Sequence, residues 1–353
     1  MPKTVPVSMN IPTPEQAGLA QPMAENTPIP ESATSAGEQE QRLSEPSLPE
    51  AEELLLVNRR YRDRLTALSL IRQLNKLLST VQRHRGVSMA LLSGAAGDMV
   101  GASDSGLLIE DLQQLQREVE RRLQFLIETC TGCDYLLPRV ERERMLHAWS
   151  TIRDGWQDDA LLDNFELHSH FIEQLLQLMA GFVRAIQPPL ANCPSQADGA
   201  LPPQVAEQLR LQVFICRKIP EIVEQFAKIR GLATHCAVVG TAVKDENQKL
   251  RFWLQCARDL NVEMLDTIAA IPLPVRRELA SLADLKSYEF KLMFFLNSIE
   301  RDVLGKEKIV ASAADIFALG SEIIDAYVAG VRDGIVLLQR WLDVELEHWL
   351  EDC

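Results

Sequence analysis

A stripe of apolar residues recurs every three or four positions along much of the chain. In the segment from Glu50 to about Ser93, its members are Leu65, Leu68, Ile71, Leu74, Leu78 and Val81. This spacing brings the side chains onto one face of an α-helix that packs against a core. No segment alternates apolar and polar residues convincingly, and long stretches are rich in helix formers. The sequence therefore predicts an all-α fold and excludes all-β and doubly wound α/β folds.

Eight helical segments are predicted from this periodicity and from the prolines and glycines that interrupt it. They span residues 50–93, 106–129, 138–153, 158–186, 204–241, 245–270, 274–302 and 307–350. A linker at residues 188–203 carries five prolines and separates a first four-helix unit, 51–187, from a second, 204–353. Residues 1–50 hold 9 of the 18 prolines and no Cys, Phe, Tyr or Trp. This segment lacks the apolar area that ordering requires, so we expect a disordered tail.

The two halves resemble each other, since each opens and closes with a long helix. Residues 81–94 read VQRHRGVSMALLSG, and residues 226–240 read FAKIRGLATHCAVVG. Arg85-Gly86 and Arg230-Gly231 occupy equivalent positions in these two segments. Duplication of a four-helix unit explains the match, and chance similarity between two amphipathic helices is the alternative. We expect two antiparallel four-helix bundles related by an internal duplication.

Charge and composition limit where the protein acts and what it binds. The 353-residue chain has a net charge of −14, which gives no general attraction to nucleic acid or to an anionic membrane surface. No segment supplies the ~18–20 apolar residues that span a bilayer, and the polar, proline-rich N-terminus lacks a signal-peptide core. Seven cysteines without framework spacing indicate reduced thiols. We expect a cytoplasmic protein that binds neither nucleic acid nor membrane directly.

The sequence carries no signature of an enzyme, a metal site or a cofactor site. It has no GxSxG, HExxH, GxxxxGK[ST] or GxGxxG motif. The single CxxC pair, Cys130 and Cys133, has no second ligand pair and is typical of a helix end. Asp159 and Asp163 share a helix face, but no second acidic motif accompanies them. We expect no catalytic residue, no metal and no cofactor.

An arginine followed by a glycine interrupts the apolar stripe in each half. Arg85 is the next member of the stripe after Val81. Arg230 lies at or beside the equivalent stripe of the helix predicted at 204–241. A guanidinium stays protonated in proteins, so a buried one needs an anionic partner or a polar cavity.

Small residues surround the first of these arginines. Gly86 lowers helix stability by about 1 kcal/mol relative to alanine, so it needs a reason such as access to the backbone. Together with Ser88 it thins the helix and leaves room for a small anion beside a planar set of donors. The alternative is a structural ion pair with a core glutamate such as Glu166 or Glu224.

Residues 81–94 resemble the opening motif of the nitrate- and nitrite-sensing (NIT) domain family. That motif has Glu-Arg-Gly, an aliphatic residue, Ser and a small or apolar run that ends at Gly. Here His84 replaces the usual Glu, which places a titratable side chain next to the arginine. Residues 164–179 and 316–342 also look like later helices of such domains, and the resemblance covers most of residues 55–345.

This resemblance implies two packed four-helix bundles and a site for nitrate or nitrite with arginine ligands. By position Arg85 is the best match to a family arginine, and Arg83 and Arg230 are further candidates, with Gly86 and Ser88 beside them. Such sensors are often fused to an output module, such as an RNA-binding antitermination domain, a kinase or a chemotaxis domain. None is recognisable here, so we expect signalling through an unidentified protein partner or through a homodimer.

Two functions stay open on this basis. The first is a non-catalytic cytoplasmic sensor of nitrate or nitrite. The second is a helical scaffold or interaction module in which the arginines form structural pairs. Acidic partners at the arginines would favour the second, and an arginine-lined cavity without them would favour the first. An enzyme is the least supported hypothesis, because the sequence shows no nucleophile–base pair and no second carboxylate cluster.

Overall fold

The computed structural model describes residues 48–94, 102–131, 134–186 and 203–352, and all regular structure in these ranges is helical. The helices are α1 (Leu48–Leu92), α3 (Ala102–Thr129), α4 (Arg139–Gly155), α5 (Leu161–Ile186), α6 (Pro203–Val213), η1 (Phe214–Lys218), α7 (Ile219–Val239), α8 (Lys244–Ala270), α9 (Leu273–Glu278), α10 (Ala280–Asp302) and α11 (Ala313–Asp352). The predicted all-α class is confirmed. Most of the tail predicted at 1–50 and of the linker predicted at 188–203 lies outside the described residues.

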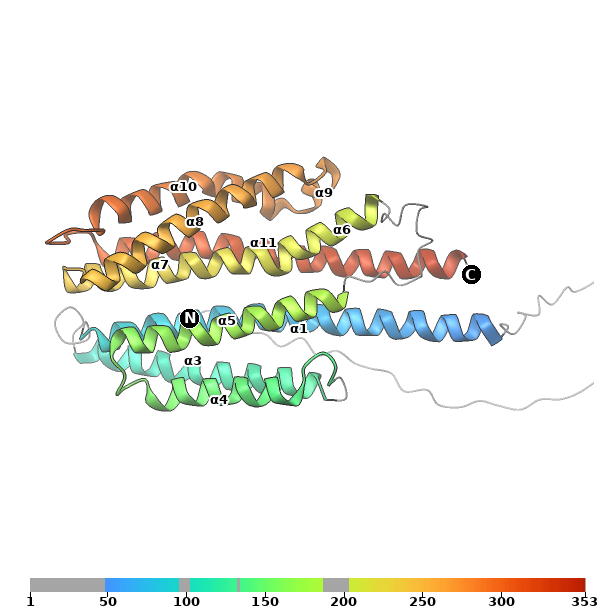
Figure 1. The fold of residues 1–353 in the computed structure, drawn as a ribbon, viewed down its shortest axis with the longest axis horizontal. Helices are drawn as coiled ribbons and strands as arrows, with labels where there is room; N and C mark the ends of the chain where they lie inside the picture. Colours follow the sequence, from blue (N-terminus) through green and yellow to red (C-terminus); the bar gives the residue numbers. More distant parts are fainter. Residues whose placement is uncertain (1–47, 95–101, 132–133, 187–202, 353) are drawn as a thin grey trace, which may run out of the picture. The chain divides into compact units, whose positions relative to one another are not determined.

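Two four-helix units follow each other along the chain (Figure 1). The first contains α1, α3, α4 and α5, and the second contains the continuous α6–η1–α7 helix, α8, α9 with α10, and α11. In both units the opening helix packs against the second and the closing helix, and the third helix packs against the closing one. Two four-helix bundles are therefore present, and their common packing order is the one expected of an internal duplication.

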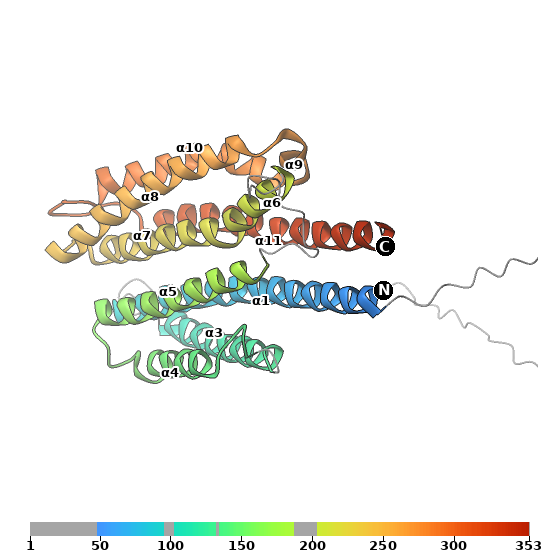
Figure 2. The same ribbon diagram turned by 45° about the vertical axis from the view of Figure 1, so that its right-hand side comes forward.

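Helices α1, α5, α7 and α11 meet where the two units face each other, and α3, α4, α8 and α10 lie on the outer sides (Figures 1 and 2). The predicted stripe of α1 is part of the core, since Leu68, Ile71 and Leu74 are at most 4% exposed. Across the junction, Gly231 of α7 lies beside the side chains of Met89 and Phe165 from the first unit. A side chain of α1 or α7 that points into this junction therefore contacts both units.

The helix predicted at 204–241 contains a wider turn that the periodicity did not indicate. The N–H of Ile219 donates to the carbonyl oxygen of Phe214, five residues back, which makes η1 a π-helical turn. The next residue, Pro220, has no N–H, and in a regular α-helix its ring would crowd the carbonyl group of Cys216. The wider turn accommodates the proline without a break in the helix.

Two later helices differ from their predicted bounds. The segment predicted at 274–302 divides at Leu279, whose ψ of 69° lies outside the helical range. The last helix begins at Ala313 rather than at 307. Within the described ranges, no helix combines the length and the apolar character that crossing a bilayer requires.

Candidate functional site

A small cavity of about 50 Å³ lies between α1 and α7, with the ring of Phe317 from α11 on its wall. Both Arg-Gly pairs, Arg85-Gly86 and Arg230-Gly231, line it. One water molecule needs on the order of 10–15 Å³ of such space. The cavity therefore suits an ion of a few atoms and excludes a metabolite or a nucleotide. The fold brings the two related motifs, far apart in the sequence, to one place.

Arg85 has its charge balanced by Glu224 of α7. Its Nη1 and Nη2 atoms donate to the two carboxylate oxygens at 2.7 and 3.2 Å. Nη1 also donates to Ser169 Oγ at 2.9 Å, and the guanidinium lies over the ring of Phe165. Arg85 and Glu224 are each only 1% exposed. This is the structural pairing that the sequence offered as an alternative, with Glu224 as the partner; Glu166 binds a lysine of α8 instead.

Arg230 makes no ion pair within the described part of the chain. Its Nη1 donates to Ser321 Oγ of α11 at 2.8 Å, and its guanidinium lies 4.8 Å from the centre of the Phe317 ring. Its Nε is buried without a hydrogen-bond partner among the described residues. Burial, and then the positive charge of Arg85, lower the pKa of Arg230 to about 10. A small anion would stabilise such a buried, uncompensated guanidinium.

Thr234 lies one turn after Arg230 on α7 and also lines the cavity. Its Oγ1 is buried and has no hydrogen-bond partner in the described structure. An unsatisfied buried hydroxyl costs about 1–3 kcal/mol, so the wall of the cavity carries two donors that an anion could satisfy. Thr234 was not predicted from the sequence, although its spacing of four residues from Arg230 places both on one helix face.

The other residues predicted for the site are placed differently. Arg83 is exposed and lines a separate groove between α1 and α3 with Asp111 and Glu118. Two residues along a helix turn a side chain by about 200°, so Arg83 points away from the cavity that Arg85 lines. Gly86 lines the cavity, and a Cβ atom added there would meet no heavy atom within 4 Å.

Ser88 is buried beside the cavity and belongs to the core. Its hydroxyl donates to Asn164 Oδ1 of α5 at 2.8 Å, which ties α1 to α5. The structure therefore brings together Arg85, Gly86 and Arg230, and leaves Arg83 and Ser88 outside the cavity wall.

The structure is similar to the solved structure of the NasR transcription antiterminator, with a TM-score of 0.62. The match covers 84% of this chain and 74% of that chain at 14% sequence identity. This chain has the NasR fold. No family model matches the sequence, and no curated protein matches it. At this identity the likeness to NasR establishes the fold alone.

In this NasR-like fold, His84 and His168 form a fully buried pair between α1 and α5. Nδ1 of His168 donates to the carbonyl oxygen of Asn164 at 2.7 Å, so its Nε2 accepts from Nδ1 of His84, also at 2.7 Å. Burial lowers the pKa of His84 to about 4 and that of His168 well below its usual value. Both rings are therefore neutral at neutral pH, and His84 adds no charge beside Arg85. This role of His168 was not predicted from the sequence.

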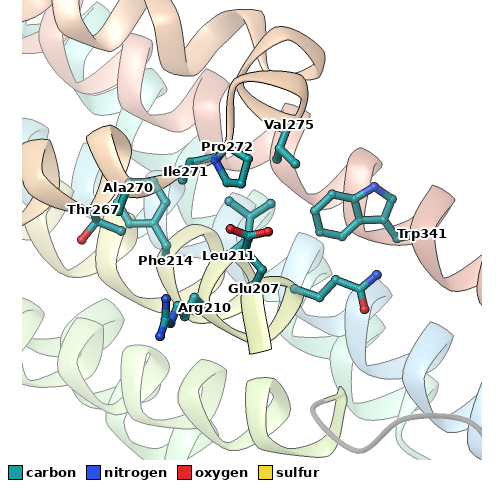
Figure 3. Close-up of a pocket in the computed structure, with 11 residues that line it drawn as sticks. Glu207, Arg210, Leu211, Phe214, Thr267, Ala270, Ile271, Pro272, Val275 and Trp341 are labelled. Atoms are coloured by element: carbon teal, nitrogen blue, oxygen red, sulfur yellow. The ribbon is translucent and has the colours of Figure 1, made fainter. Parts of the chain in front are cut away.

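A larger and mostly apolar pocket of about 260 Å³ lies between α6, the end of α8 and α11 (Figure 3). Phe214, Ile271 and Trp341 contribute to its walls, and the charged side chains of α6 are Glu207 and Arg210. None of the predicted anion ligands lines it. Apolar walls do not replace the hydration of an inorganic anion, so this pocket is not the candidate anion site.

Gly320 of α11 determines the path of the Arg230 side chain. A Cβ atom at Gly320 would lie 2.9 Å from Cγ and 3.1 Å from Cβ and Cδ of Arg230. These atoms belong to the stem near the backbone, so the side chain cannot swing clear at its tip. Gly320→Ala is expected to reduce the free energy of unfolding by about 1–3 kcal/mol through overpacking, and to displace Arg230 from the cavity wall.

Urea unfolding measures this effect, with Gly181→Ala as the matched control. A Cβ at Gly181 meets only the flexible Arg184 Nη2 at 3.8 Å. Replacement of this helical glycine with alanine is expected to raise the free energy of unfolding by up to about 1 kcal/mol. Equal stability of the two variants would contradict the close approach of Gly320 and Arg230.

Proposed function

We propose that the protein senses nitrate or nitrite in the cytoplasm by binding the anion in the cavity between α1 and α7. Arg230 is the principal ligand, Thr234 donates its hydroxyl, and Arg85, whose charge Glu224 balances, contributes to the polar wall. One observation carries the proposal: Arg230 is buried on the cavity wall with an unsatisfied Nε and no ion pair in the described structure. An anion there would compensate the charge and accept the free hydrogen bond.

The size and charge of the cavity favour a small monovalent anion. Its volume of about 50 Å³ accommodates only a few atoms. Glu224 already balances Arg85, so Arg230 is the cation left to compensate among the described residues that line the cavity, and a doubly charged anion would bring an excess negative charge into a buried site. A planar guanidinium suits the coplanar oxygens of nitrate or nitrite.

Two further observations support a sensor. The resemblance of residues 81–94 to the NIT motif points to these anions, and the NasR fold is that of a transcription antiterminator. The cavity also lies at the junction of the two units, between α1, α7 and α11. Differential binding to two arrangements of these helices would shift the packing of one unit against the other. We propose that an unidentified protein partner, or a second copy of the chain, reads this shift without any catalytic step.

The alternative is a helical interaction module without a ligand. The buried Arg85–Glu224 pair favours it, because the arginine with the best match to the family motif already has a carboxylate partner. In this case Arg230 would rely on Ser321 and Phe317 for its stabilisation.

Thermal unfolding in nitrate, nitrite, chloride and sulfate at equal ionic strength tests the proposal. A ligand at 100 times its Kd stabilises the folded state by about 2.7 kcal/mol, so nitrate or nitrite should raise the Tm. Arg230→Gln is expected to abolish this rise, because it removes the charge and the planar donors. Arg83→Gln is the control, since Arg83 lies in the other groove and its loss should leave the rise intact.

The anion series separates the two candidate functions. A rise with nitrate or nitrite alone, lost in Arg230→Gln, supports the sensor. A rise that chloride and sulfate reproduce, or that survives in Arg230→Gln, contradicts the site. The absence of a rise with every anion favours the interaction module.

A further inference from the structure

A chain of polar contacts runs from the cavity wall to α8. Oγ of Ser93, directly after α1, lies 2.8 Å from Nδ1 of His235 on α7. The other ring nitrogen, Nε2, lies 3.3 Å from Oε1 of Glu246 on α8. At the opposite end, the same Ser93 Oγ lies 2.7 Å from the carbonyl oxygen of Met89. Ser93 and His235 both line the anion cavity, so this chain of contacts adjoins whatever the cavity holds.

The three contacts need three protons. The carbonyl oxygen of Met89 and the carboxylate of Glu246 only accept, so every proton must come from Ser93 or His235. The serine supplies one and a neutral imidazole supplies one, which leaves one contact without a proton. An imidazolium supplies two, and then both contacts of Ser93 are hydrogen bonds and the contact with Glu246 is an ion pair. All three contacts of Ser93 and His235 are therefore satisfied only when His235 is protonated.

The charged and titratable groups around His235 come from every helix that packs there. On α1, Arg85 is balanced by its carboxylate partner. On α7, Arg230 is uncompensated, and the thiol of Cys236 contacts Glu246. On α8, Glu246 is 6% exposed, and on α11 the exposed Asp325 acts on Arg230 from a distance. An anion bound at Arg230 would compensate that arginine, which leaves the buried Glu246 carboxylate beside His235 as the charge to be balanced.

A proton on His235 would balance the Glu246 carboxylate. Burial lowers the pKa of His235 below its usual value, and the Glu246 carboxylate opposes this shift. Burial therefore favours the neutral ring while the cavity holds no anion. A negative charge in the same cavity favours the imidazolium and raises the pKa.

We propose that the cavity binds its anion together with one proton, and that His235 holds this proton between Ser93 and Glu246. The inference rests on the proposed function, because it requires an anion in the cavity. The protonated His235 then stabilises the anion by its charge alone, because its two N–H groups face Ser93 and Glu246. By linkage, the affinity for nitrate falls by up to about tenfold per pH unit between the pKa of His235 in the free protein and that in the complex.

Isothermal titration of the full chain with sodium nitrate tests this inference over about pH 5.5–8.5, the range in which a histidine titrates. Each pH is measured in two chloride-free buffers that differ in ionisation enthalpy, because the difference in observed heat gives the number of protons taken up. We expect close to one proton per nitrate near pH 7, with an affinity that weakens as the pH rises.

Two variants and a control identify the residue that takes up the proton. His235→Gln keeps a polar side chain but cannot be protonated, so its nitrate affinity should be independent of pH. Glu246→Gln removes the carboxylate that stabilises the imidazolium and should reduce the proton uptake. His147→Gln, an exposed histidine of α4, should behave like the unaltered protein. If His235→Gln fails to fold, a comparison of proton uptake between the unaltered protein and Glu246→Gln still tests the inference.

The outcomes distinguish this inference from the proposed function. Nitrate binding with proton uptake that is lost in His235→Gln supports both. Nitrate binding without proton uptake, or with uptake that persists in His235→Gln, overturns the inference and leaves the sensor intact. No nitrate binding at any pH overturns both.

Discussion

Replacing Glu224 with alanine is expected to lower the free energy of unfolding by about 3–5 kcal/mol. The substitution leaves Arg85, which is 1% exposed, without its carboxylate, and a guanidinium does not lose its proton to escape burial. The amide of Gln82 also loses its acceptor, since its Nε2 donates to Oε2 of Glu224 at 2.9 Å. Urea unfolding followed by circular dichroism measures the loss.

Two comparisons make this result specific to the buried pair. Glu263→Ala removes an exposed ion pair with Lys218, and it should change the stability by less than about 1 kcal/mol. The double replacement Arg85→Met with Glu224→Leu removes both charges and should recover most of the stability. A loss below about 1 kcal/mol for Glu224→Ala would contradict the pairing, because it would mean that Arg85 needs no carboxylate. Anion-dependent stabilisation that persists in the double variant would assign the ligand to Arg230.

Acidification from about pH 7 to pH 4.5 is expected to lower the stability by an amount of the order of 2–3 kcal/mol from His84 alone. The unfolded chain binds a proton at His84 below its ordinary pKa of 6.5, whereas burial keeps the folded form neutral down to about pH 4. The stabilisation is therefore fully present above pH 6.5 and is lost as the pH falls towards 4. The pKa of His168 is lowered as well, so it acts in the same direction.

Unfolding free energies in urea at a series of pH values measure this slope. His84→Phe keeps a buried aromatic ring that cannot be protonated, and the slope should become shallower. His147→Gln, exposed on α4, should leave the slope unchanged. A stability that is constant between about pH 7 and pH 4.5 would contradict the neutral burial of His84.

The helices were predictable because their signal is local. The three- and four-residue spacing of Leu68, Ile71 and Leu74 depends only on neighbours along the chain, and these residues are buried as expected. The π-helical turn was not predicted, although its cause, Pro220, is visible in the sequence. The periodicity continues across such a turn, so an apolar stripe alone gives little indication of it.

The candidate site was only partly predictable. Position on the helix distinguishes Arg85 from Arg83, because two residues along a helix place the side chains on nearly opposite faces. The same reasoning would have connected Thr234 with Arg230. Spacing along the chain cannot predict the contact between Ser93, which follows α1, and His235 of α7, because the two residues lie far apart in the sequence.

The all-α class and the interruption of apolar stripes by Arg85 and Arg230 are visible in the sequence, because both follow from the 3.6-residue period of the helix. Which of the two arginines is compensated depends on contacts between helices. Glu224 meets Arg85 across the junction of the two units, whereas Arg230 meets the uncharged Ser321 and the ring of Phe317. The state of a buried charge depends on atoms within a few ångströms, and here other helices supply those atoms.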